Sequence, residues 1–304
     1  MFIELIKLLS KRTFKDQENS GIWFPDPEKF QVIQQLYSND LSNHQLNRLS
    51  EDFTASLSFF DINGMWKTTS NNRLRKYDAK VIEILKKTNT KNRIEFLDIG
   101  ASDGCTTLYF LEQIKHNSNF ENIRTLVMDK YLYLNTFSFL RIKEYRASDG
   151  TRILVRIGPI GLRLPGSAHS KGLISRFFAI LYSKQSCFSN RMKFIKKYLL
   201  LNPKIRLISN ISAVECDIIK FNNCYKSKFD IIRASNTLNL SYFPVNDLKC
   251  AIKNIFKYLT DGGILVVSNA ANGSIWQKKR YEFFQLSKLG KGSEIDLLIK
   301  TDYV

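Results

Sequence analysis

The stretch Ile94-Glu-Phe-Leu-Asp98-Ile-Gly100-Ala101-Ser102-Asp-Gly104 decides the predicted fold. Its first six residues form a short apolar run, which is typical of a buried strand, and the glycine-containing segment that follows is typical of a tight turn. A helical pattern then covers Thr106 to Ile114, and a second apolar run, Ile123 to Met128, ends at Asp129. A strand, a turn, a helix and a strand in this order make a βαβ unit, which predicts a parallel sheet.

The same alternation resumes in the C-terminal third of the chain. It predicts two strands, a helix, a third buried strand and a final antiparallel hairpin, at Ala213–Asp217, Phe229–Ala234, Leu248–Leu259, Ile264–Val267, and Tyr281–Leu286 with Glu294–Ile299. We expect Asn246 or Asp247 to cap the helix, because short polar side chains accept from the free amides of a first turn. Gly262-Gly263 should end the helix, and Gly290 with Gly292 should form the hairpin turn.

Two further regions complete the predicted organisation. Residues 1–92 carry helical patterns, starting at Asp26-Pro27, at Leu41 to Phe53 and at Tyr77 to Leu85, and predict an N-terminal helical cap. Residues 93–304 form the α/β domain, interrupted by an insert at about 131–212. Within the insert, Ser148-Asp-Gly150 predicts a hairpin turn. Two helices are predicted there, at Leu173–Lys184 and Met192–Leu201.

Composition excludes several classes of protein. The chain of 304 residues is 44% hydrophobic, which is ordinary for a globular protein. No apolar run reaches the roughly 20 residues that a spanning helix needs. The N-terminal apolar run is interrupted by Glu4 and Lys7 and lacks a cleavage site, so a secretory signal is not expected. The five cysteines have no paired or zinc-binding spacing, so we expect reduced thiols, no metal site and a cytoplasmic protein, with peripheral membrane attachment as an alternative.

The net charge of +18 is unevenly distributed along the sequence. No Asp or Glu lies between Asp149 and Glu215, whereas twelve Lys and Arg residues do, interleaved with aromatic residues. Three interpretations stay open. The predicted helix at Leu173–Lys184 could lie on an anionic membrane surface, or the basic and aromatic side chains could bind single-stranded RNA. Alternatively, the insert packs as a lid on the α/β domain and its charges are solvated.

The turn after the first strand narrows the choice of ligand. A dinucleotide fingerprint would require glycine at positions 102 and 105, where Ser102 and Cys105 stand. The Gly-Lys-Ser/Thr of a phosphate-binding P-loop is absent. Asp98, two residues before Gly100, suits a cationic ligand better than a pyrophosphate, and a sulfonium that carries an ammonium group is such a ligand.

These residues resemble the class I S-adenosylmethionine-dependent methyltransferases. Asp98-x-Gly100-x-Ser102-x-Gly104 is similar to their D/E-x-G-x-G-x-G motif, with Ser in place of the middle Gly, and Asp261 to Val267 resembles their "PGG-strand" signature with Asp in place of Pro. The resemblance covers about Tyr77 to Val304 outside the insert. It implies a doubly wound, mostly parallel, seven-strand-type sheet of the Rossmann-like kind. The donor-binding residues that it implies are Asp98, Gly100, Ala101, Ser102, Gly104, Asp129, Asp217 and Asn236.

Within this set the resemblance assigns separate roles. The turn holds the methionine and ribose moieties, Asp129 accepts from the ribose hydroxyls, Asp217 contacts the adenine amino group, and Asn236 lies beside the methionine moiety. The implied activity is transfer of a methyl group to an oxygen or nitrogen nucleophile of a small, lipid-like or anionic acceptor. Ser235-Asn-Thr-Leu238 replaces the Asn/Asp-Pro-Pro-Tyr/Phe signature of amino-group methyltransferases, which disfavours base or amide acceptors.

The sequence contains few residues that indicate how an acceptor would be activated. His169, in an irregular part of the insert, is the best imidazole for a general base, although a loop histidine without a role is the simpler interpretation. Alignment of the reactants alone can supply roughly 7–11 kcal/mol of barrier reduction, so a dedicated base is not required. Two other functions compete with the enzyme. One is an RNA-modifying or RNA-binding protein that uses the basic insert, and the other is a non-catalytic partner subunit that binds the donor.

Overall fold

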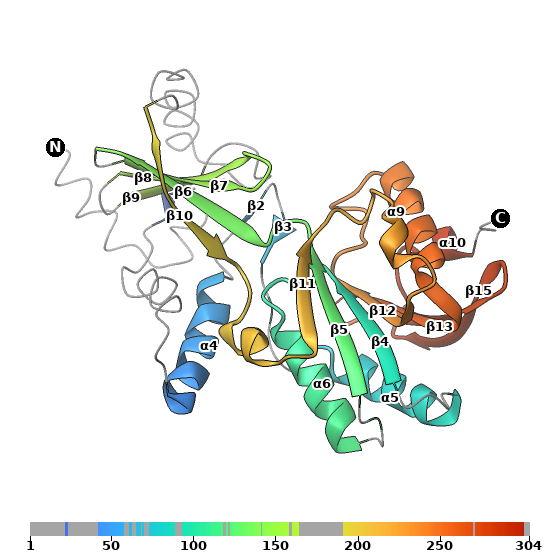
Figure 1. Cartoon of the computed structure of the whole chain (residues 1–304). Helices are drawn as coiled ribbons and strands as arrows, with labels where there is room; N and C mark the ends of the chain where they lie inside the picture. The colour runs from blue at the N-terminus through green and yellow to red at the C-terminus, as the bar shows by residue number, and fades with distance from the viewer. Residues whose placement is uncertain are drawn as a thin grey trace. The chain divides into compact units, whose positions relative to one another are not determined.

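The computed structural model describes residues 22–23, 42–57, 61–62, 65–67, 69, 73–88, 93–117, 120, 122–140, 142–157, 160–163, 191–269 and 271–300. The chain forms two compact units (Figure 1). The first unit combines Met1–Thr68 with Tyr131–Leu200, and the second combines Thr69–Lys130 with Leu201–Val304. The two units are described separately below.

The second unit contains a seven-stranded sheet. Its strands, in spatial order, are β11 (Ile211–Glu215), β5 (Asn122–Asp129), β4 (Arg93–Ile99), β12 (Phe229–Ser235), β13 (Leu259–Ser268), β14 (Gly273–Lys279) and β15 (Glu282–Leu289). The first five strands are parallel, whereas β14 is antiparallel to both of its neighbours. The chain builds β4, β5 and β11 outward in one direction and then returns to the other side of β4 with β12. This sheet confirms the predicted mostly parallel α/β fold.

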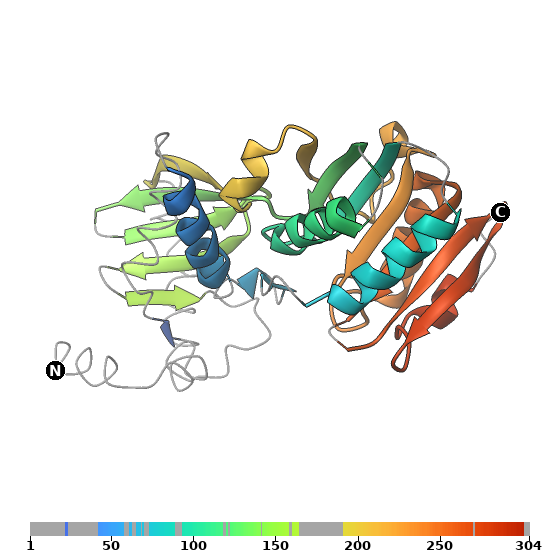
Figure 2. The same cartoon turned by 90° about the horizontal axis from the view of Figure 1, so that it is seen from below.

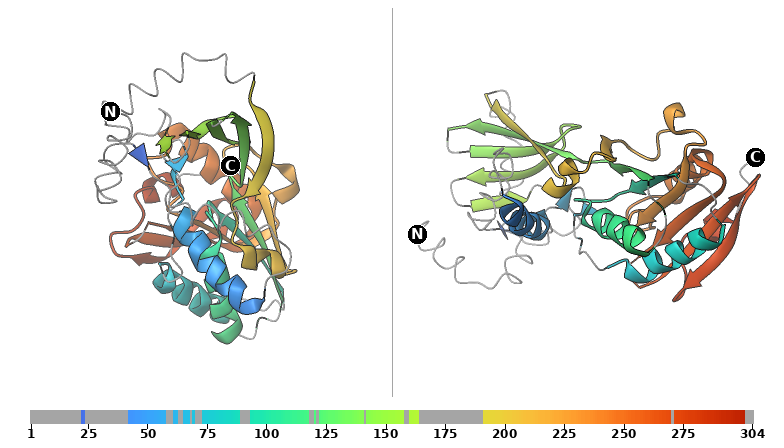
Figure 3. Two further views of the ribbon diagram at one scale, coloured as in Figure 1. Left: turned by 90° about the vertical axis from the view of Figure 1, so that its left-hand side faces the viewer. Right: turned by 60° about the horizontal axis from the view of Figure 1, so that its bottom comes forward.

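Helices cover both faces of this sheet. On one face, α5 (Arg75–Thr88) and α6 (Cys105–Asn117) pack on side chains such as Phe96 and Ile231 (Figures 2 and 3). On the other face, α9 (Val245–Tyr258) and the short α10 (Asp296–Ile299) pack on side chains such as Leu97 and Ile232. Neighbouring strand residues therefore belong to opposite cores, because side chains alternate along a strand. Burial on both faces explains the continuous apolar runs in the sequence and confirms the doubly wound arrangement.

The first unit contains a six-stranded sheet whose strand pairs are all antiparallel. The strands, in spatial order, are β1 (Ile22–Trp23), β9 (Ile160–Arg163), β8 (Arg152–Ile157), β7 (Ile142–Ala147), β6 (Tyr133–Phe139) and β10 (Lys193–Leu199). The β7–β8 pair confirms the hairpin predicted around Ser148-Asp-Gly150. The unit also contains α4 (Asn43–Leu57) and a small ladder of β2 (Asp61–Ile62) with β3 (Met65–Trp66).

One predicted helix of the insert is a strand. The sequence Met192–Leu201 satisfies a helical pattern, but Lys193–Leu199 forms β10 and pairs with β6. Phe194, Ile195 and Tyr198 are residues that favour strands, and a partner strand more than fifty positions earlier decides between the two conformations. Such long-range pairing leaves no periodic signal in the segment itself.

Three predictions at the C-terminal end are also wrong. Helix α9 begins at Val245 after Pro244, without a side-chain cap from Asn246 or Asp247. It ends at Tyr258, and Gly262 lies within β13 with φ of +78° and does not end the helix. The final hairpin is β14 with β15, whereas the segment after Gly292 forms α10.

Several predictions remain open. The predicted helices at Asp26–Tyr37 and Leu173–Lys184, and His169, lie outside the described residues. The helix predicted at Tyr77–Leu85 is confirmed as α5 and belongs to the same compact unit as the seven-stranded sheet. Whether residues 1–92 act as a cap stays a prediction. Every helix in the described part of the chain is too short or too polar to cross a bilayer.

Candidate functional site

The ends of three parallel strands, β4, β5 and β12, meet around the turn that follows β4. The amide of Gly100 donates to the carbonyl oxygen of Met128 at 2.7 Å, and the amide of Ser102 donates to Oδ2 of Asp129 at 3.1 Å. On the other side, Oγ1 of Thr237 donates to the carbonyl oxygen of Ile99 at 3.2 Å. The turn is thus tied to the ends of both neighbouring strands, at the point where the strand order reverses. Ligands of open α/β sheets bind at this point.

The backbone of this region is unusually strained. Gly100 and Gly104 have φ of +65° and +80°, which only glycine adopts easily. Ser102 and Asn236 also have positive φ, +61° and +56°, although each carries a side chain. A non-glycine residue in this conformation costs about 1–3 kcal/mol, and such residues concentrate at functional sites. Leu140, Ser227 and Arg280 also have positive φ elsewhere in the described chain, so the strain is compatible with a site at the turn and does not by itself locate one.

The two glycines of the turn have a packing role that the sequence does not reveal. A Cβ on Gly100 would lie 1.9 Å from Oγ1 of Thr237, and a Cβ on Gly104 would lie 2.1 Å from Cδ1 of Ile205. The sequence predicts that glycine lets a ligand approach the backbone. At Gly100 the side chain of Thr237 already makes that close approach, so glycine is required there whether or not a ligand binds. At Gly104 the nearest atom is the movable end of the Ile205 side chain, and the φ of +80° is the stronger reason for glycine.

Asp98 lies in a buried ion-pair network. Both of its carboxylate oxygens accept from the guanidinium of Arg233, and Oδ2 also accepts from Oγ1 of Thr107 at 2.6 Å. The same guanidinium donates through Nη1 to Oδ1 of Asp78 on α5 at 2.9 Å. The side chains of Arg233, Asp98 and Asp78 are only 2–3% exposed. The network binds Asp98 inside the protein, so its predicted contact with a cationic ligand stays a prediction.

Arg233 was missed by the sequence analysis, although a signal was present. It is a charged residue at the centre of the apolar strand Phe229–Ala234, and buried arginines need a partner. A carboxylate on the next strand was available at Asp98, whose Cα pairs directly with that of Arg233 in the register of β4 and β12. The second carboxylate, Asp78, comes from a helix and could not have been paired with Arg233 from the sequence.

The network holds two carboxylates and one guanidinium, which affects the titration of Asp78. Burial raises the pKa of Asp78 to about 6, the nearby Arg233 opposes this increase, and the charge of Asp98 adds to it. Oδ2 of Asp78 has no hydrogen-bond partner among the residues that the structure describes. The ionised form of Asp78 is therefore disfavoured in the folded protein, because the carboxylate is buried and lies near the charge of Asp98.

We predict that Asp78→Asn changes how stability depends on pH. In the wild type, the unfolded chain loses the Asp78 proton near pH 4 and the folded chain near pH 6, so folding stability falls as pH rises between these values. The free energy of unfolding of the variant, relative to wild type, should therefore increase by about 2 kcal/mol from pH 4 to pH 7. Urea unfolding at several pH values measures this difference.

Glu83→Gln on the same helix provides the control for this measurement. Hydrogen bonds from Lys80 and Lys87 lower the pKa of the exposed Glu83 carboxylate to about 2, so its removal should give a smaller effect of the opposite sign. A difference for Asp78→Asn that is flat, or that falls with rising pH, would contradict the proposed charge balance.

The other predicted acids lie at the ends of neighbouring strands. Asp129 ends β5 and is 8% exposed, and Asp217 follows β11, whose Glu215 pairs with Asp129 in the parallel register. Oδ2 of Asp217 lies 3.1 Å from Nζ of Lys130, and its Oδ1 accepts from the amide of Ile219 at 3.1 Å. The structure thus brings Asp129 and Asp217 to one edge of the sheet.

Asn236 reaches the same edge from β12. Its amide donates to the carbonyl oxygen of Ser268 at 2.6 Å, and the next residue, Thr237, contacts the turn at Gly100. Ala101 and Ser102 are buried within that turn. The strand ends and the turn therefore form one cluster in the folded chain. The individual donor contacts assigned to these residues stay predictions.

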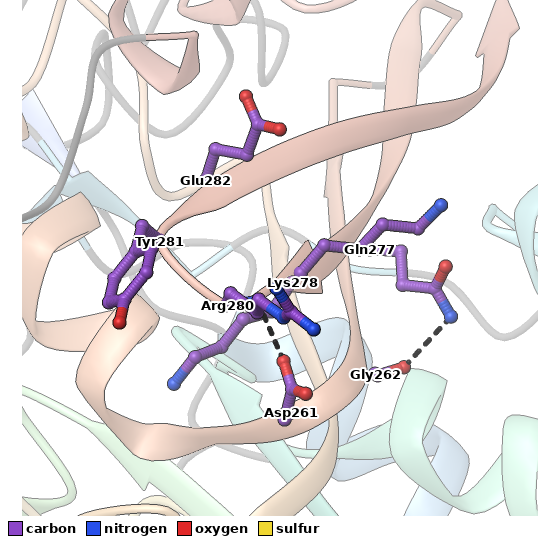
Figure 4. A pocket seen from close by; sticks show the side chains of 8 residues that line it. Asp261, Gly262, Gln277, Lys278, Arg280, Tyr281 and Glu282 are labelled. Carbon is purple, nitrogen blue, oxygen red and sulfur yellow. Dashed lines mark hydrogen bonds between the residues drawn. The ribbon is translucent and has the colours of Figure 1, made fainter.

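Two hollows of about 560 Å³ lie elsewhere on this unit. One lies at the start of β13 and the turn between β14 and β15, where the amide of Arg280 donates to Asp261 and Gln277 donates to the carbonyl oxygen of Gly262 (Figure 4). The other lies along the first residues of β4, β5 and β12, beside Arg93 and Arg124. Neither hollow is lined by a predicted donor-binding residue, and both lie away from the carboxyl ends of the parallel strands.

This arrangement is that of a doubly wound, mostly parallel α/β fold. No protein-family model matches the sequence, and no curated protein matches it. Among solved structures, N-methyltransferase NodS from Bradyrhizobium japonicum with S-adenosylhomocysteine is 17% identical, with 71% of each chain covered and a TM-score of 0.31. An S-adenosylmethionine-dependent methyltransferase from Clostridium acetobutylicum is 13% identical, covering 71% of this chain and 61% of that one, with a TM-score of 0.31.

The structural neighbours also include a protein with another activity. The [4+2]-cyclase SpnF is 13% identical, with a TM-score of 0.28, and the match covers 64% of this chain and 45% of the cyclase. The chain therefore spans less than half the length of that protein. These similarities concern the fold alone, and the case for a function rests on the residues around the turn.

Proposed function

We propose that this chain is an S-adenosylmethionine-dependent methyltransferase. The observation that carries the proposal is the junction of the β4 turn with the end of β5, where the amide of Ser102 meets the carboxylate of Asp129 at the reversal of strand order. A carboxylate in this position can accept two hydroxyl hydrogen bonds from a ribose. The residues assigned to the donor are Asp98, Gly100, Ala101, Ser102, Gly104, Asp129, Asp217 and Asn236.

The residues fit a nucleoside better than a pyrophosphate. The two strand-end carboxylates, Asp129 and Asp217, would repel phosphate groups, whereas a ribose and an exocyclic amino group both offer donors to them. Lys130 beside Asp217 offsets part of this negative charge. Asp98, two residues before Gly100, is paired with the buried guanidinium of Arg233.

The reaction that we propose is transfer of a methyl group to an oxygen or nitrogen of a small or anionic acceptor. The bound donor supplies an electrophilic methyl group on a sulfonium: a bond forms from the acceptor atom to the methyl carbon while the carbon–sulfur bond breaks, and the acceptor loses its proton to water. The contribution of the protein is to hold the two reactants in line and to exclude competing water.

Isothermal titration with S-adenosylhomocysteine tests the donor site. We expect wild-type binding in the micromolar range, which corresponds to about −8 kcal/mol. Asp129→Ala should weaken binding about 10- to 100-fold, because hydrogen bonds to a charged group contribute about 1.5–3 kcal/mol. Asp261→Ala removes an exposed carboxylate at the start of β13, away from the turn, and should bind as the wild type does.

The outcomes separate the competing functions. If the wild type gives no heat with S-adenosylhomocysteine, the proposal is wrong. If the donor product binds but the protein consumes no radiolabelled S-adenosylmethionine with any acceptor mixture, the chain is the non-catalytic, donor-binding partner subunit that the sequence left open.

A further inference from the structure

The six-stranded sheet presents a row of aromatic and basic side chains on one face. Along β6, Leu134 and Thr136 are buried, and the alternate residues Tyr133 and Phe137 therefore lie on the opposite face. In the register with β10, Phe194 lies opposite Phe137, and their ring centroids are 5.7 Å apart. This face, formed by Tyr133, Phe137, Arg146, Phe194 and Lys197, is called the aromatic–basic face below.

Cations lie among these rings. Arg146 on β7 has its guanidinium carbon 4.4 Å from the centroid of Phe137, and Lys197 on β10 has Nζ 3.8 Å from the centroid of Tyr133. Glu144 lies opposite Phe137 in the register of β6 and β7, so its buried carboxylate belongs to the same face, where it pairs with both Arg146 and Arg152. Two arginines thus compensate one carboxylate, and Lys197 adds a further positive charge.

The edge strand β10 extends this surface toward solvent. Lys193, Lys196 and Lys197 are exposed, and between them Phe194 and Ile195 are 57% and 50% exposed. Lysines on an edge strand can serve to prevent edge-to-edge aggregation. That role does not explain Phe194 and Ile195, because exposed apolar residues on an edge strand promote the aggregation that lysines prevent. Phe194 and Lys197 lie on the same face in the register with β6, and an exposed ring beside a lysine is the combination that stacks a base and pairs with its phosphates.

We propose that the aromatic–basic face binds single-stranded nucleic acid. Rings on a sheet face that stack successive bases, with cations beside them for the phosphates, are an established way to hold a single strand. An anionic membrane is the less supported partner, because that alternative depends on the predicted amphipathic helix at Leu173–Lys184, which lies outside the described residues. The proposal uses no residue of the donor site and stands independently of the proposed methyltransferase activity.

Fluorescence anisotropy of a labelled oligouridylate of about 12 nucleotides with the full chain tests this proposal. We expect binding at about 50 mM salt that weakens strongly at about 200 mM. Phe194→Ala and Phe194→Leu should each weaken binding about 10-fold, with the dependence on salt unchanged, and Phe194→Tyr should retain affinity. Lys197→Gln should reduce the slope of log K against log salt by about 0.7, the contribution of one phosphate contact to a single strand.

The β14–β15 hairpin offers a matched control. Phe284 on β15 is 52% exposed, and Nζ of Lys279 lies 4.3 Å from its ring centroid, so this pair has the same chemistry outside the aromatic–basic face. Phe284→Ala and Lys279→Gln should leave oligonucleotide binding unchanged. No binding at about 50 mM salt, or equal losses in both sets of variants, would overturn the proposal. Sedimentation with phosphatidylserine vesicles that depends on Phe194, without oligonucleotide binding, would assign the face to a membrane instead.

Discussion

Replacing Arg233 with Met should lower the free energy of unfolding by about 3–5 kcal/mol. The substitution leaves the carboxylates of Asp98 and Asp78, each about 3% exposed, without the guanidinium that compensates them. It also removes the cation that lies 5.2 Å from the ring centroid of Phe110. Removing one partner of a buried ion pair lowers the stability of the fold by much more than the intact pair contributes to it. The reason is that the remaining charge is buried in a medium that solvates it poorly.

Urea unfolding, followed by tryptophan fluorescence, measures this loss. Arg93→Met is the control, because Arg93 pairs with Glu95 at the surface, with 46% of its side chain exposed, and such pairs contribute about 0–1 kcal/mol. A chain with Arg233→Met, Asp98→Asn and Asp78→Asn together should recover much of the lost stability, because it buries no uncompensated charge. If Arg233→Met is no more destabilising than Arg93→Met, the network does not have the role described above.

This network shows where prediction from the sequence ends. Asp98 could be placed at the end of a strand, before a turn, because apolar runs and glycines are local signals. The groups that surround Asp98 could not be predicted, because Arg233 comes 135 positions later and Asp78 belongs to a helix that precedes the strand. The glycine-containing motif therefore placed the Asp98 carboxylate correctly, but it did not indicate which group neutralises that carboxylate.

The same distinction explains the errors in secondary structure. The core strands β4, β5 and β12 were predicted closely because most of their residues are buried and their sequences are mainly apolar. β10 has one buried residue among exposed ones, so its pattern was compatible with a helix, and only pairing with β6 makes it a strand. The C-terminal hairpin was misplaced because its tight turn at Arg280-Tyr281 contains no glycine, whereas Gly290 and Gly292 mark a later bend.

The reason for Gly100 was also beyond the sequence. Its position in a strand-to-helix turn predicted a site where a ligand reaches the backbone. The structure gives a second reason, because the side chain of Thr237 packs against the place where a Cβ would stand. Both reasons require glycine, so the presence of glycine in the motif cannot distinguish ligand approach from internal packing. Substitutions that separate the two effects are needed.

Gly100→Ala should destabilise the fold by about 3 kcal/mol or more, through two separable effects. The first is the conformational cost of a left-handed residue with a Cβ, about 1–2 kcal/mol. The second is overlap, because the new Cβ would lie 1.9 Å from Oγ1 and 2.7 Å from Cγ2 of Thr237, and displacing packed atoms costs roughly 1–3 kcal/mol. Gly262→Ala isolates the first effect, since Gly262 has φ of +78° and a Cβ at this position would meet no described atom within 4 Å.

The overlap with Thr237 can be removed in a second variant. Thr237→Gly eliminates the side-chain atoms that the new Cβ meets. In a chain that already carries Thr237→Gly, adding Gly100→Ala should therefore lower the free energy of unfolding only as much as Gly262→Ala does in the wild type. Urea unfolding of the four variants provides the comparison. If Gly100→Ala costs no more than Gly262→Ala, Thr237 does not constrain the turn. If its cost stays high without the Thr237 side chain, the geometry of the turn itself requires glycine, and the packing explanation is wrong.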